Sequence, residues 1–253
     1  MKTIAFIITL AVAGTSVAQA QFLPSGWRLG LRGGATYAAI KGKDAEQIRG
    51  GTGKNDYKLG FNAGLSFQIP LSADGFWTLA PELLVNRKGY EREYETKDAT
   101  NLALINATGP TPSGTLEKYE SKDRRSLTYI ELPIPVRINT ASGGSGLYFE
   151  LGPQVGYMAR SSRENKQVFK YTNENTEKLR TDEGSAKEDL VSFDIGAIAG
   201  LGFQTESGFS LGVRYNQGLK TLFDTKDVSA KNEPRAFNQA YMAQIGYLLP
   251  LGK

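Results

Sequence analysis

Three acidic side chains are the best candidates for chemistry in this 253-residue sequence. Glu131, Glu150 and Asp194 lie inside apolar segments, where a carboxylate could serve as a general acid or base. The chain has no histidine and no cysteine, the usual proton-transfer group and the usual thiol nucleophile. A serine–lysine or paired-carboxylate site stays open as an alternative. We expect instead that these acids pair with arginines such as Arg137 and Arg214, and we predict no catalytic residues.

Cofactor and metal sites lack suitable residues as well. Without histidine or cysteine, a metal would have only acids to bind, and these do not follow the spacing of a calcium-binding loop. The stretch "IRGGTGKND" resembles a phosphate-binding loop, but Ile48 replaces the first glycine and Asn55 follows the lysine. The sequence therefore predicts no metal and no cofactor.

The segments that would position the three acids alternate between apolar and polar residues. In "YKLGFNAGLSFQIPL", Tyr57, Phe61 and Leu65 share one parity, while Lys58 and Gln68 share the other. A side-chain period of two predicts a β-strand with two unlike faces. Seven other segments alternate in the same way, so we predict eight strands, at residues 26–39, 57–71, 76–90, 127–139, 147–160, 191–204, 208–220 and 237–251.

The predicted connections alternate between short and long. Short Gly/Ser/Asp turns are predicted at 72–75, 140–146 and 206–208, and long charged loops at 41–56, 91–126, 161–190 and 221–236. Short turns at one end and long loops at the other are typical of an outer-membrane barrel. The predicted fold class is all-β, an eight-stranded antiparallel up-and-down transmembrane β-barrel.

Alternation alone does not tell which face points inward. A soluble lipocalin-like barrel that binds an apolar ligand would place the apolar face inside, and this alternative stays open on parity alone. Many glycines share the polar parity, with Gly33 an exception, and a narrow lumen needs such small residues beside large ones. Aromatic residues on the apolar parity lie toward strand ends, as in the girdles of membrane barrels.

We therefore predict a polar lumen filled with side chains. Charged residues of both signs lie on the polar parity, and Lys88, Arg160 and Lys220 share it. The predicted lumen network consists of Arg28, Arg32, Lys58, Glu82, Glu131, Arg137, Glu150, Asp194 and Arg214.

The N-terminus indicates export. Residues 1–20 combine Lys2, an apolar run and an Ala18-Gln19-Ala20 box, which predicts a signal peptide cleaved after Ala20 and a barrel domain over 21–253. The formal charge of +4 falls to +3 without Lys2, too little to indicate nucleic-acid binding. We expect the mature chain in the bacterial outer membrane, in contact with its lipid.

Several stretches resemble the PorT-like outer-membrane β-barrel family, often labelled porin-family proteins. They are "GWRLGLRGGATYA", "YIELPIPVRI" followed by "GLYFELGPQVGYMA", and "FDIGAIAGLGFQ" with "GFSLGVRYNQGL". The resemblance spans the mature chain and implies an eight-stranded barrel. One member of the family is associated with protein secretion. The ending "YLLPLGK" departs from the terminal aromatic of many such barrels.

The sequence therefore predicts a non-enzymatic outer-membrane barrel. Loops 91–126 and 161–190 are the candidate partner-binding segments, because functional sites concentrate on loops held by a rigid scaffold. In the first loop, "YETKDATNLALI" is expected to fold over the barrel mouth or to contact a partner. An eight-stranded barrel is filled by its own side chains, so we expect no general-diffusion pore.

Overall fold

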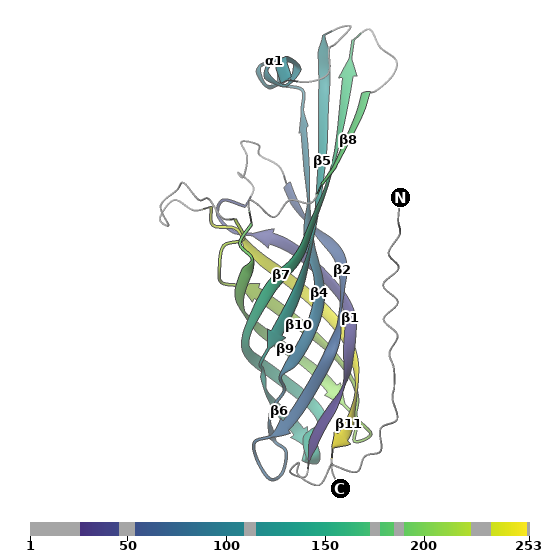
Figure 1. Ribbon diagram of the computed structural model, residues 1–253, viewed down its shortest axis with the longest axis vertical. Coiled ribbons are helices and arrows are strands. Elements are labelled where there is room, and N and C mark those ends of the chain that lie inside the picture. Colours follow the sequence, from purple (N-terminus) through teal and green to yellow (C-terminus); the bar gives the residue numbers. More distant parts are fainter. Residues whose placement is uncertain are drawn as a thin grey trace.

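The strands form a closed antiparallel ring. The computed structural model describes residues 26–45, 54–108, 115–172, 178–184, 190–223 and 234–251. Eight strands complete the ring, because the first strand pairs with both its sequence neighbour and the last strand (Figure 1). In spatial order they are β1 (Trp27–Lys41), β11 (Phe237–Leu251), β10 (Phe209–Gly218), β9 (Phe193–Gln204), β7 (Ser145–Tyr171), β5 (Leu116–Pro133), β4 (Glu82–Thr96) and β2 (Lys54–Pro70). This confirms the predicted eight-stranded barrel.

Two of the predicted strands are interrupted by proline, which has no N–H to give to a strand ladder. Strand β3 (Trp77–Leu79) is separated from β4 by Ala80 and Pro81, and β6 (Val136–Ala141) is separated from β5 by Ile134 and Pro135. The two gaps face each other, since the Ala80 amide donates to the Pro135 carbonyl at 2.8 Å. β3 and β6 thus continue the barrel wall to the end with the short turns.

The apolar parity faces outward. Leu59 exposes 71% of its surface, whereas Gln68, on the other parity of β2, exposes 2%. Leu84, Met242 and Leu248 are apolar but lie on the polar parity, and all three are buried. The interior is therefore polar and filled, and the alternative of a soluble barrel with an apolar cavity is wrong.

Two predicted loops contain long strand segments. β4, β5 and β7 run past the ring, and β8 (Lys178–Gly184) pairs with the far half of β7 (Figure 1). We call this four-stranded part, built from residues 91–96, 116–125, 162–171 and 178–184, the sheet extension. A short helix, α1 (Ala99–Thr108), lies near its tip (Figure 1). Hydrophobic alternation does not reveal these strands, because charged residues occur on both of their faces, as in the Asp123–Arg163 ion pair on the face of Tyr119.

A bulge in β7 reverses the side-chain parity near residue 159. The pairing with β5 shifts between Thr128↔Arg160 and Tyr129↔Met158, so Ala159 is the extra residue. Met158 and Ser161 are both buried as a result, while Arg160 is exposed. Arg160 therefore does not share the lumen face as its parity predicted, and Lys220, just past β10, is exposed too.

No helix in the described ranges is long and apolar enough to cross a membrane. The predicted signal peptide, residues 1–20, lies outside the described residues.

Candidate functional site

The middle of the lumen holds a buried cluster of arginines and glutamates. Glu82 accepts hydrogen bonds from Arg32 Nη1 at 2.6 Å and from Arg214 Nη1 at 2.8 Å. Glu150 accepts from Arg137 Nε at 2.8 Å and from Arg214 Nε at 2.7 Å. A third arginine reaches the first acid, since Arg137 Nη2 lies 3.3 Å from Glu82 Oε1. Such charges are tolerable inside a protein only when they are paired in this way.

Tyr148 completes this cluster as a neutral partner. Its hydroxyl accepts from Arg32 Nη2 at 2.6 Å, and the Arg137 guanidinium lies 4.6 Å from its ring centroid. The ring fits only because the strands beside it carry glycine. A Cβ at Gly202 or at Gly212 would lie 2.4 Å from the tyrosine oxygen. These lumen glycines therefore make room for large neighbours, as their parity predicted.

A second buried group lies closer to the long-connection end. Lys88 Nζ is 2.6 Å from Glu131 Oε1 and 3.3 Å from the Asn216 side-chain oxygen. Asn86 donates to the other Glu131 oxygen at 2.9 Å. Asp194 accepts from Asn238 Nδ2 at 2.9 Å. The two groups together balance four cations against four anions, counting Arg32, Arg137, Arg214 and Lys88 against Glu82, Glu150, Glu131 and Asp194.

Amide side chains fill the short-turn end of the lumen. Gln204 Nε2 donates to Gln68 Oε1 at 2.8 Å and to the Gly144 carbonyl at 2.9 Å. Gly144 belongs to the short 3₁₀ turn Ser142–Gly144 and has a φ of 74°, a conformation that favours glycine. Asn139 donates to the Gly75 carbonyl of a second turn at 3.0 Å. Two of the turns are thus tied to side chains inside the barrel.

An apolar cluster lies at the opposite end, where the long connections leave the strands. It is built from buried residues of the barrel wall and of the segments that follow it, and Leu190 and Phe223 form a β-bridge between two of these segments. Its members are Ile40, Ala45, Tyr90, Leu127, Tyr129, Met158, Leu190, Leu222, Phe223 and Ala236. We call this group the apolar cap. The described part of the lumen is therefore filled by charged and amide groups, with an apolar layer at the end where the long connections leave the strands.

Two of the predicted network residues lie at the rims of the lumen. Arg28 is half-buried near the short-turn end, and its Nη1 has no hydrogen-bond partner among the described residues. Lys58 is half-buried and donates to Ser126 Oγ at 2.5 Å. The structure places the other seven, Arg32, Glu82, Glu131, Arg137, Glu150, Asp194 and Arg214, inside the barrel.

The predicted network omitted Lys88 and Tyr148. Lys88 was on the polar parity, and this parity was the signal that could have included it. Tyr148 shares the polar parity of the neighbouring Glu150, so an aromatic residue on that parity could have been read as a lumen partner.

One face of the sheet extension carries a ladder of opposite charges. Lys122 Nζ contacts Glu93 at 2.5 Å and Glu91 at 3.3 Å across β4 and β5. Arg124 Nε is 3.2 Å from Glu91, and Lys118 Nζ is 3.1 Å from Glu95. The pKa of Lys122 is raised, chiefly by its hydrogen bond to Glu93. These cross-strand pairs support the strands where apolar contacts are missing.

The sheet extension also has a small apolar core that holds α1. Leu102 of the helix packs with Leu116, Phe169 and Tyr171 of β5 and β7, and Ile105 is packed against them. The predicted placement of "YETKDATNLALI" over the barrel mouth is therefore wrong, because its apolar part is α1 near the tip of the extension (Figure 1).

No group of three or more acids among the described residues could hold a metal ion. Two cavities lie on the outside of the barrel wall, as the residues lining them show. The acids proposed as alternative catalytic groups, Glu131, Glu150 and Asp194, bond to Lys88, to two arginines and to Asn238 respectively.

A structural comparison finds solved outer-membrane barrels that are similar to the chain at low identity and low TM-score. Ail of Yersinia pestis is 12% identical with a TM-score of 0.37, over 90% of this chain and 100% of that chain. OprG of Pseudomonas aeruginosa is 12% identical with a TM-score of 0.34, over 89% and 97%. The outer membrane protease OmpT of Escherichia coli is 10% identical with a TM-score of 0.31, over 91% and 99%.

The sequence itself matches one family model. A comparison with curated proteins finds no match. The model described as "Outer membrane protein beta-barrel domain" matches residues 18–224, which is most of the chain.

Proposed function

Because the chain belongs to the outer membrane protein beta-barrel domain family, we propose that it is a closed, non-enzymatic anchor that presents its sheet extension to a partner protein. One observation carries the proposal. β4 and β5 keep the same pairing from Leu84↔Glu131 in the barrel wall to Thr96↔Tyr119 in the extension, without a shift where they leave the barrel. The extension is thus one piece with the wall, and a binding surface built on it is held at a fixed orientation.

The barrel below serves as an anchor rather than as a passage. An eight-stranded barrel is only wide enough for its own side chains. Here the Arg/Glu cluster, the amides around Gly144 and the apolar cap occupy successive levels of the lumen. We expect no sugar-sized conductance from the purified protein in planar bilayers. A steady conductance in that range would contradict the closed anchor.

The two faces of the sheet extension differ in what they offer a partner. On the charged face the described side chains form ion pairs with one another, so they offer little to a charged group of a partner. The opposite face carries the half-buried Tyr94 and Tyr119 in ring contact, at 6.2 Å between centroids, beside the buried core that holds α1. Aromatic residues on a rigid sheet are typical of protein-binding surfaces. We therefore assign partner contact to the α1 face.

Site-specific crosslinking tests this assignment. A photo-crosslinking residue replaces Ser121 on the α1 face, Lys122 on the charged face, or Leu211 on the lipid-facing wall. In intact cells we expect a discrete protein adduct from the Ser121 position and none from the two control positions. Adducts of equal yield at Ser121 and Lys122 would contradict the choice of face. The absence of protein adducts at both positions would contradict partner binding through the extension.

We further propose a PorT-like branch of the family and an export signal that is removed from the mature chain. The strand signatures around Glu131 and Pro133 support a PorT-like branch, and with it a role in protein secretion or in the cell envelope. The export signal supports cleavage after Ala20, so that the mature chain begins at Gln21. N-terminal sequencing of protein purified from outer membranes tests the cleavage site. Deletion of the gene followed by a census of secreted proteins tests the role in secretion.

A further inference from the structure

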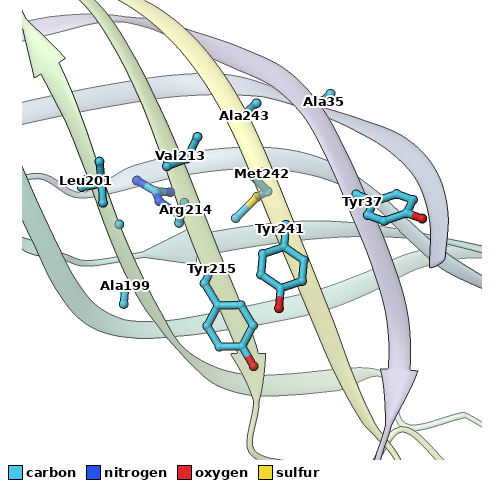
Figure 2. A pocket seen from close by; sticks show the side chains of 11 residues that line it. Ala35, Tyr37, Ala199, Leu201, Val213, Arg214, Tyr215, Tyr241, Met242 and Ala243 are labelled. Atoms are coloured by element: carbon cyan, nitrogen blue, oxygen red, sulfur yellow. The ribbon is translucent and has the colours of Figure 1, made fainter.

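The outer wall of the barrel contains a hollow over four adjacent strands. Its volume is about 560 Å³, and it lies across β9, β10, β11 and β1 (Figure 2). Register explains the depression. Ala35 pairs with Ala243, and the larger Val213 and Leu201 stand beside this alanine pair on β10 and β9. Tyr37, Tyr215 and Tyr241 form its rim on the side of the long connections (Figure 2).

A second hollow continues the first one along β1, β10 and β11. Its volume is about 450 Å³, and Gly33 and Ile245 lie in its lining, two residues from Ala35 and Ala243. The position of Gly33, the outward-facing exception among the strand glycines, is thereby explained. From Tyr37 to Leu31 the two hollows follow β1 for roughly 20 Å, at ~3.4 Å per residue. With the strand tilt of a barrel this length spans about one leaflet of a ~30 Å hydrocarbon layer.

The end of the hollow nearest the long connections carries hydrogen-bonding groups. Tyr57 Oη donates to Gln239 Oε1 at 2.7 Å, and Gln239 Nε2 donates to Tyr215 Oη at 2.6 Å. A third hydrogen bond ends this series, because Tyr215 Oη donates to Gln217 Oε1 at 2.6 Å. Tyrosines with one wet edge mark the level of lipid headgroups. The hollow is therefore apolar along its length and polar at one end, which is the pattern of a lipid.

A lysine gives this polar end a positive charge. Lys41 Nζ lies 5.2 Å from the centroid of the Tyr57 ring, which is itself stacked on Tyr37 at 4.7 Å. No ion pair joins Lys41 to an acid among the residues that the structure describes. Lys41 therefore places a positive charge just above the tyrosines, where the anionic group of a lipid would lie.

We propose that the two hollows bind one phosphorylated glycolipid of the outer leaflet, with an acyl chain along Ala35, Ala243 and Gly33 and a phosphate at Lys41. The membrane location of the family puts lipid against this wall. The end with the long connections faces outward in barrels of this layout, which selects the outer leaflet. This proposal is independent of the sheet extension and of any partner bound there.

Native mass spectrometry of the full-length protein in detergent tests the site. The probe is purified diphosphoryl lipid A, compared with its dephosphorylated form and with phosphatidylglycerol. We expect one lipid A per chain and weaker adducts with the other two lipids. Ala35→Leu combined with Ala243→Leu fills the hollow and should lower the affinity about tenfold. Lys41→Gln should remove the preference for the phosphorylated lipid while leaving binding of the dephosphorylated form unchanged.

The matched control is Ala159→Leu, which adds the same side chain on an exposed position of β7 outside the hollows. It should bind lipid A as the natural chain does, and heat-modifiable gel mobility shows that each variant is a folded barrel. The proposal is overturned if the natural chain holds no lipid A, if the filled variant binds as well as the control, or if the Lys41→Gln variant keeps its preference for diphosphoryl lipid A over the dephosphorylated form.

Discussion

Arg214 and Glu82 form a bidentate pair across the barrel, with Nη1 2.8 Å from Oε2 and Nη2 3.1 Å from Oε1. They belong to β10 and β4, which lie four strands apart in either direction around the ring. The pair therefore ties opposite walls together through the middle of the lumen. An open pore would require this ion pair to break. The pair therefore supports a closed lumen, and with it the proposed anchor function.

Removing the cation of this pair should be strongly destabilising. Arg214→Met leaves Glu82 and Glu150 buried with fewer partners, which costs about 3–5 kcal/mol in comparable pairs. Urea unfolding followed by heat-modifiable gel mobility should show the lower midpoint. Val213→Met, one residue away on the lipid face, is the control and should unfold like the natural chain. Equal midpoints for the two variants would contradict a structural role for the pair.

The space for the Tyr148 hydroxyl gives a second prediction. Gly212→Ala places a Cβ 2.4 Å from that oxygen, and overpacking of this kind costs about 1–3 kcal/mol. Tyr148→Phe removes the oxygen, so the double variant should lose less stability than the sum of the two single variants. The measurement is a double-mutant cycle of unfolding free energies. Additive losses of stability would show that the Tyr148 oxygen is not what restricts position 212 to glycine.

These barrel features were largely predictable, since parity sorts each strand into a lipid face and a lumen face. Arg32, Glu82 and Arg214 could be placed inward because alternation and glycine parity agree along their strands. Arg160 was placed inward wrongly, because the bulge at Ala159 inserts a residue without a sequence signal. Lys220 was also placed inward wrongly, because β10 ends at Gly218, two residues earlier than predicted.

The sheet extension could not be predicted by the same reasoning. Its strands follow charge pairing rather than hydrophobic alternation, as in Glu93↔Lys122. Its apolar core joins Leu102 to Phe169, which are far apart in the chain. Pairing over such separations depends on the barrel strands that bring β5 and β7 together.

The charged face of the extension should keep its structure over a wide pH range. The pKa of Lys122 is raised above its ordinary 10.5, chiefly by the hydrogen bond to Glu93, so this contribution is complete below that pH and is lost only as pH rises through the folded value. The pKa of Glu164 is lowered from 4.5, chiefly by its hydrogen bond to Lys166, so its contribution is present above that pH and disappears as pH falls through the folded value.

The pH dependence of the charged face can be measured by hydrogen exchange. The readout is the protection factor of residues 118–124 and 163–168, which corrects for the intrinsic exchange rate. We expect constant protection between about pH 5 and pH 9 and a decrease below about pH 4. High salt should reduce the pH effect, because these pairs are exposed and screened. A decrease centred near neutral pH would contradict the assignment, since neither group titrates there.

The N-terminus of α1 gives the last prediction. Asp98 Oδ1 accepts hydrogen bonds from the backbone amides of Thr100 at 3.1 Å and Asn101 at 3.0 Å, which is the geometry of a helix cap. A helix of this length is marginal by itself, so it depends on this cap and on the packing of Leu102. Asp98→Ala should destabilise the docked helix by about 1 kcal/mol and Asp98→Asn by much less, because asparagine caps equally well. Limited proteolysis within residues 99–108 of the folded barrel should be about fivefold faster for Asp98→Ala. If both variants were cleaved as slowly as the natural chain, α1 would be held by its apolar contacts alone and the cap would have no part in presenting that face.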